Sequence, residues 1–86
     1  MNIEKKCAPK FFKAILDGRK TFEIRLADWK CKAGDVLVLR EWNSKQNEYT
    51  GRILKKKITY ALKTKDLKFF TKNDIDKYGF QVIAFH

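Results

Sequence analysis

Histidine, cysteine and glycine are scarce in this chain of 86 residues, and each shortage excludes a kind of site. The one histidine is His86, and the two cysteines, Cys7 and Cys31, do not form a close pair, so no zinc-ligand set can be assembled. Four glycines cannot make a glycine-rich phosphate loop in the required spacing. We therefore expect no metal and no cofactor. Free thiols in a reducing cytosol are the default, with a Cys7–Cys31 disulfide as the alternative.

Long hydrophobic runs are also missing. No stretch approaches the length that spans a membrane, and Met1 to Lys6 lacks the apolar centre of a signal peptide. We therefore expect a cytoplasmic protein with no membrane partner. The sequence has no linker, internal repeat or low-complexity tract, which predicts a single domain over residues 1–86. It does not fix the oligomeric state, and a monomer is the expectation.

Acidic residues are few relative to basic ones. Twenty Lys and Arg residues stand against 10 Asp and Glu, which gives a net charge of +10. This balance favours polyanionic partners by long-range attraction. The alternative is a surface whose charge serves solubility only. Charge of this kind indicates a class of partner and not a fold.

The stretch from Gly18 to Arg25 organises the rest of the chain. Before it, Pro9 opens an apolar pattern with helical spacing, which predicts a helix over 9–17 that ends at Gly18. After it, apolar residues alternate from Phe22 to Leu26, which predicts a half-buried strand.

Three charged residues, Lys20, Glu23 and Arg25, gather where this helix end meets the strand start. Such a group can hold a phosphate, a base edge or a carboxylate. The alternative is a same-face ion pair between Glu23 and Arg25 on a solvated strand, which adds little stability.

The remaining sequence predicts further short elements. Residues 3–7 alternate weakly and fit an edge strand, and residues 36–62 fit a hairpin with a loop of about five residues and a bulge near Gly51. Thr71 has the character of a helix N-cap, which predicts a short helix to about Lys77. Leu67, Phe69, Phe70 and Ile75 are expected to anchor this segment, and residues 80–85 to form a closing strand.

Other candidate ligand contacts lie outside the Gly18–Arg25 stretch. Trp29 stands among charged residues, either as a surface on which a base stacks or as a plug folded over the core. Parity turns Lys55 and Lys57 outward, either as a ridge that contacts phosphates or, as we slightly favour, as charges that guard a sheet edge. Trp42 and Tyr49 are expected to pair across strands.

The chain resembles the ASCH domain, a PUA-like β-barrel family. Gly18, Lys20, Glu23 and Arg25 match all four positions of its G-x-K-x-x-E-x-R signature. Supporting segments resemble small bacterial and phage members, and they are Thr21 to Arg25, Ala33-Gly34-Asp35, Leu39-Arg40-Glu41-Trp42, Tyr49-Thr50-Gly51-Arg52 and Gly79 to Ile83. The histidine that such members often carry in residues 3–7 is absent.

This resemblance implies an α+β fold, a small barrel of about five to six mostly antiparallel strands with one or two short helices. It also implies a cleft that binds RNA or a nucleotide ligand, lined by Lys20, Glu23 and Arg25, with Gly18 allowing close approach. Around that cleft we add weaker candidates from the sequence, which are Trp29, Arg40, Lys55 and Lys57.

The resemblance also implies an alternative function. Some ASCH members resemble ribonucleases, and another branch deacetylates a modified cytidine with the signature lysine and a threonine. Here Glu23 occupies the threonine position, so that nucleophile is missing. In a hydrolase of this chain, Glu23 would act as general base and Lys20 would stabilise an oxyanion. Whether the protein is an enzyme stays open, as does a protein-binding role.

Overall fold

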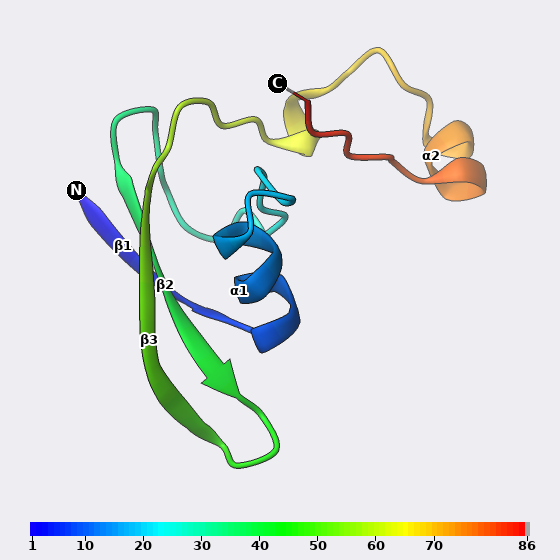
Figure 1. Cartoon of the computed structure of the whole chain (residues 1–86). Coiled ribbons are helices and arrows are strands. Elements are labelled where there is room, and N and C mark those ends of the chain that lie inside the picture. Colours follow the sequence, from blue (N-terminus) through cyan, green and yellow to red (C-terminus); the bar gives the residue numbers. More distant parts are fainter. Residues whose placement is uncertain (86) are drawn as a thin grey trace.

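A computed structural model describes residues 1–85 as an α+β fold built on a three-stranded open sheet (Figure 1). Its elements are β1 (Asn2–Cys7), α1 (Pro9–Leu16), β2 (Val36–Asn43), β3 (Glu48–Lys57), a 3-10 turn η1 (Thr64–Asp66) and α2 (Lys72–Tyr78). The strand order is β1-β2-β3, with β1 parallel to β2 and β3 antiparallel to it. The predicted edge strand, hairpin and two helices are therefore confirmed.

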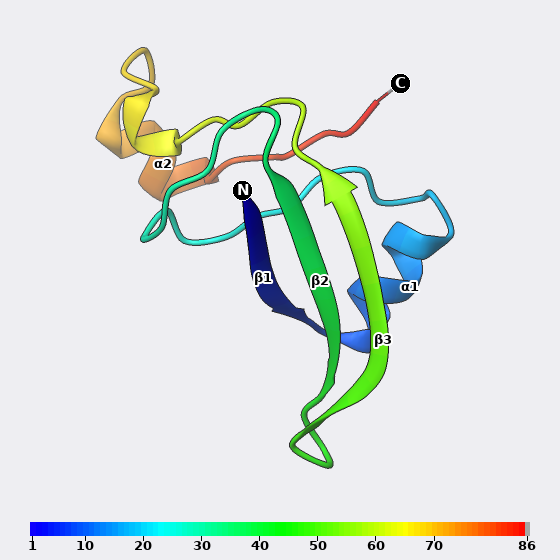
Figure 2. The ribbon, with the colours of Figure 1, turned by 90° about the vertical axis from the view of Figure 1, so that its left-hand side faces the viewer.

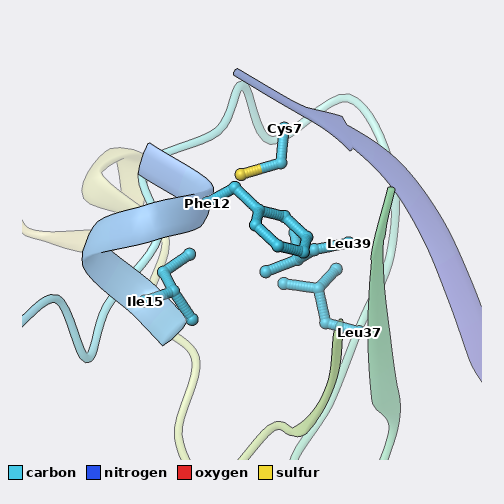
Figure 3. Packing of buried hydrophobic residues seen from close by; sticks show 5 residues of the cluster. All are labelled: Cys7, Phe12, Ile15, Leu37 and Leu39. Atoms are coloured by element: carbon cyan, nitrogen blue, oxygen red, sulfur yellow. The ribbon is translucent and has the colours of Figure 1, made fainter. Parts of the chain in front are cut away.

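The hydrophobic core lies between α1 and the facing side of the sheet. Phe12 and Ile15 reach down from the helix and meet Leu37 and Leu39 of β2, with Cys7 at the end of β1 completing the cluster (Figure 3). Helical spacing places only Phe12 and Ile15 on the buried side, since Phe11 and Leu16 are each about half exposed.

Gly18 ends α1 and turns the chain back along it. Its φ of 81° is in the left-handed region, and the N–H groups of Gly18 and Arg19 donate to the carbonyls of Ile15 and Ala14. These two bonds form a Schellman motif, which glycine favours because it has no Cβ. No atom lies within 4 Å of the place where a Cβ would sit at Gly18. Glycine is therefore required here by the left-handed turn, and not by the close approach of another group.

The hairpin contains the predicted irregularity. Arg40 pairs with Ile53, but Trp42 pairs with Tyr49, so three residues of β3 stand opposite Glu41 alone. Gly51 lies within this bulge with a φ of 95°. The strand ends at Lys57 and not at Leu62. Lys56 stands opposite Leu37 in regular register.

The prediction of a closed barrel of five to six strands is wrong for the described residues. Residues 20–26 and 80–85 alternate as strands do, but neither segment joins the sheet. In the first, Ile24 and Leu26 are 68% and 82% exposed. Alternation identifies a chain that is able to pair, but it does not supply a neighbouring strand edge.

The segment after β3 lies to one side of the sheet (Figure 1). Thr71 caps α2 as predicted, because its hydroxyl accepts from the Asp74 N–H at 3.1 Å. The expected anchoring over a barrel is wrong, since α2 buries no residue and Phe69 is 77% exposed. Phe70 instead packs against Phe69 and Phe80 within the same segment. Within residues 1–85 no helix has the length and apolar character that crossing a membrane requires.

Replacing Phe12 by alanine tests the small core. Phe12 is 2% exposed, so Phe12→Ala is expected to lower the free energy of unfolding by about 3 kcal/mol or more, through lost burial and the cavity left behind. Phe11→Ala, one residue away and 49% exposed, is the matched control and should cost under about 1 kcal/mol. Urea denaturation followed by circular dichroism measures both. Equal losses in the two variants would contradict this placement of the core.

Candidate functional site

The Schellman turn delivers Lys20 to the start of a charged network. The Lys20 N–H donates to the Ala14 carbonyl at 3.0 Å, which fixes the residue against the end of α1. Its ammonium then donates to Glu23 Oε1 at 2.6 Å and to the Phe22 carbonyl at 2.7 Å. Because an ammonium has three N–H donors, one of them is left for another acceptor.

Glu23 and Arg25 complete the network and fasten it to the sheet. The Arg25 Nε donates to Glu23 Oε2 at 2.8 Å, and its Nη2 donates to the Lys6 carbonyl at 2.7 Å. The side chains of Lys20, Glu23 and Arg25 are 15%, 20% and 30% exposed. The structure therefore brings the three charged signature residues together. They are more enclosed than the surface ion pair weighed as an alternative.

A second charged network lies on the same side of the sheet, inside the hairpin bulge. Glu41 is 5% exposed and accepts from Arg52 Nε and Nη2, both at 2.9 Å, and from the Thr50 hydroxyl at 2.7 Å. The two-pronged bond from Arg52, followed by the Thr50 bond, lowers the pKa of the Glu41 carboxyl to about 2. Sequence reasoning noted these residues as supporting segments but missed this network. The bulge signal at Gly51 was the clue to it.

Cys7 is buried beside these networks. Burial raises the pKa of its thiol, and the nearby Glu23 carboxylate raises it further. Both cysteines, Cys7 and Cys31, are free thiols in the structure. No group of three or more metal-binding side chains occurs among residues 1–85.

An open hollow of about 410 Å³ adjoins Lys20, between α1 and the chain that follows it. Its lining is basic and aromatic, and consists of Lys10, Phe11, Lys13, Ala14, Arg19, Lys20 and Phe22. The Lys20 ammonium lies 5.6 Å from the Phe11 ring centre and 5.0 Å from that of Phe22. Cations beside exposed aromatic faces can meet a phosphate and an unstacked base together.

The weaker sequence candidates are not brought to this hollow. Trp29 packs against the core, as in the plug alternative, with the Lys5 ammonium 4.1 Å from its ring centre. Arg40, Lys55 and Lys57 stand on the opposite face of the sheet, because the residues of β2 and β3 that face α1 are their immediate neighbours in sequence. The hollow residues Lys10, Lys13 and Arg19 were not predicted. The i, i+3 spacing of Lys10 and Lys13, which places both on one face of α1, is the signal that could have found these two.

The fold and these networks define a small basic α+β protein with two ion-pair clusters on one side of an open sheet. The family described as "Domain of unknown function (DUF3850)" matches residues 4–74, so the chain belongs to that family. It is also 39% identical over 56 residues to the "Uncharacterized 12.9 kDa protein in GpA 3'region" of Escherichia phage P2, an alignment that covers 65% of this chain. The chain spans about half (50%) of that relative's length. No solved structure matches it significantly.

The buried carboxylate of Glu41 gives a prediction for stability against pH. Its pKa in the folded chain, about 2, lies below its ordinary 4.5, so its stabilising contribution is complete above about pH 4.5 and is lost as the pH falls towards 2. Glu41→Gln is therefore expected to be less stable than the parent by about 2 kcal/mol at neutral pH, with the difference shrinking below pH 4.5.

Urea denaturation across the pH range measures this difference. Glu48→Gln, which removes an exposed carboxylate at the start of β3, is the control and should change stability little at any pH. A difference between Glu41→Gln and the parent that stays constant from pH 7 to the acid limit would contradict the assigned role of the ion pair.

Proposed function

We propose that this protein binds nucleic acid, and single-stranded RNA in particular, through the hollow beside Lys20. The observation that carries the proposal is the lining of that hollow, in which four cations surround two aromatic rings. Phosphates would meet Lys10 and the free donor of Lys20, and would compete with Asp17 for its exposed ion-pair partners Lys13 and Arg19. A base would stack against Phe11 or Phe22. The net charge of +10 supports this class of partner.

We also propose kinship with the ASCH family, supported by the signature, and a cytoplasmic location, which suits two free thiols.

The arrangement of the signature favours binding as its purpose. Glu23 holds Lys20 and Arg25 at once, and each of these cations also donates to one backbone carbonyl. Lys20 is thereby presented at the rim of the hollow in one orientation, so binding a phosphate there costs little further side-chain entropy. Arg25 already donates to Glu23 and to the Lys6 carbonyl of β1, and its part in the proposed site is to hold Glu23.

A hydrolase acting on RNA or on a modified nucleoside is the second candidate. The observation in its favour is the 2.6 Å contact between Lys20 and Glu23 beside an open hollow. Each oxygen of Glu23 already accepts one hydrogen bond from a cation, however, so only one further acceptor site on each oxygen remains for a water to be activated. Because Glu23 is already committed to these two cations, we place the hydrolase second.

Binding is tested with a short fluorescein-labelled single-stranded RNA in fluorescence anisotropy titrations at several salt concentrations. The triple variant Lys10→Gln/Lys13→Gln/Lys20→Gln is expected to bind about tenfold more weakly, and the slope of log affinity against log salt should fall by about 2, or 0.7 for each lost phosphate contact. The control, Lys65→Gln/Lys68→Gln/Lys72→Gln, removes the same charge from the exposed segment around η1 and α2 and should lose far less.

The same reactions report on hydrolysis when the RNA is run on a denaturing gel. RNA that is bound and stays intact supports the proposal. RNA that is cut by the parent and left whole by Glu23→Gln would replace it by the hydrolase. An RNA that is neither bound nor cut at low salt, or equal losses in the two triple variants, would contradict a binding site in the hollow.

A further inference from the structure

The sheet has a second face, turned away from α1, that no other helix or strand of residues 1–85 covers. Figure 2 looks directly onto it, with β1, β2 and β3 in front and α1 behind. The register places its side chains: Lys6 stands beside Arg40, Trp42 beside Tyr49, and Val38 and Val36 beside Lys55 and Lys57. We call this the outer face and define it by Lys6, Arg40, Trp42, Tyr49, Lys55 and Lys57.

Two cations of the outer face are held on aromatic rings. The Arg40 guanidinium carbon lies 3.9 Å from the Tyr49 ring centre, and the Lys6 ammonium lies 3.7 Å from that of Trp42. The two rings pack edge to face at 4.9 Å, which fixes both supports relative to each other. A guanidinium stacked on a ring keeps its N–H donors around its edge, where they can meet a phosphate.

Arg40 differs from the arginines of the two charged networks in having no acceptor. Arg25 and Arg52 each donate two side-chain hydrogen bonds, whereas the Arg40 side chain makes neither a hydrogen bond nor an ion pair within residues 1–85. Over the same part of the chain Lys6, Lys55 and Lys57 also lack an ion-pair partner. Glu4 is the acidic residue that shares this face.

The cations of the outer face repel one another unless an anion binds between them. Lys6 and Arg40 are register neighbours on adjacent strands about 4.8 Å apart, and Lys55 and Lys57 are about 7 Å apart along β3, so like charges repel. A polyanion with regularly spaced charges relieves this repulsion. Tyr49 lies at one end of the outer face and is 39% exposed, which gives an unpaired base an aromatic surface to contact.

We propose that the outer face is a second binding surface for single-stranded RNA, separate from the hollow. Arg40 and Lys6 take phosphates at the aromatic end, Lys55 and Lys57 take the phosphates that follow along β3, and a base stacks at Tyr49. The proposal rests on the proposed function for the class of ligand, but it uses side chains on the opposite side of the sheet.

A third triple variant, Arg40→Gln/Lys55→Gln/Lys57→Gln, matches the hollow and control triples in charge removed. In the same anisotropy titrations it is expected to bind the RNA about tenfold more weakly than the parent, with a salt slope reduced by about 2. Thermal denaturation followed by circular dichroism checks that all three variants remain folded. If the outer variant binds like the control triple, the outer face is overturned while the hollow stands.

The outcomes separate the two proposals. A loss in the outer variant together with normal binding in the hollow variant supports the outer face and removes the hollow, and losses in both support two surfaces. Absence of binding by the parent overturns both. Vesicles of anionic phospholipid serve as a second polyanion. If the parent binds these vesicles as tightly as RNA, and the outer variant no longer binds them, the outer face is overturned as an RNA surface.

A spectroscopic readout tests contact directly. Trp29→Phe leaves Trp42 as the one indole, because the chain has two tryptophans. Added RNA is expected to quench or shift the Trp42 emission in this variant, and the change should disappear with Arg40→Gln/Lys55→Gln/Lys57→Gln. An emission unchanged at saturating RNA would overturn the placement of RNA against the Trp42–Tyr49 end.

Discussion

Three carboxylates, on Glu23, Asp35 and Glu41, each join parts of the chain that the small core does not hold together. Glu23 binds Lys20 to Arg25, and Arg25 reaches the Lys6 carbonyl in β1. Asp35 accepts from the Met1 ammonium and the Lys32 N–H, which fixes the start of β2 beside the start of β1. The N–H of Lys32, followed by the Met1 ammonium, lowers the pKa of Asp35.

Glu41 joins the two strands of the hairpin, and its bonds to Arg52 and Thr50 explain why the bulge is tolerated. Three residues of β3 stand opposite one of β2, so the ladder between the strands is interrupted there. Arg52 and Thr50, on either side of Gly51, both bond to the Glu41 carboxylate and close this gap with side chains. The Arg52 guanidinium also lies 4.8 Å from the Phe12 ring centre, which ties the hairpin to the core.

The sequence predicts those parts of this fold that depend on local order. Pro9 and Gly18 bracket α1, Thr71 caps α2, and Gly51 marks the bulge, because each depends on the conformational preference of one residue. An open sheet could not be told from a closed barrel in this way, since strand pairing depends on edges far apart in sequence. The signature cluster was accessible because its residues lie within six positions of one another, from Lys20 to Arg25. The Glu41–Arg52 network was missed because it needs the hairpin register first.

The placement of the acidic side chains also determines which cations are paired. Glu23 and Glu41 occupy Arg25 and Arg52, so these arginines contribute architecture. At the hollow, Asp17 pairs with Lys13 and Arg19, whereas the outer-face cations Lys6, Arg40, Lys55 and Lys57 have no acidic partner within residues 1–85. The net charge of +10 alone does not predict such a division. The contacts of Arg40 with Tyr49 and of Lys6 with Trp42 add a little stability to the fold, and they also hold two cations in fixed positions, which solubility alone does not require. Fixed cations reduce the entropy lost on binding, and that benefit arises only when an anion binds.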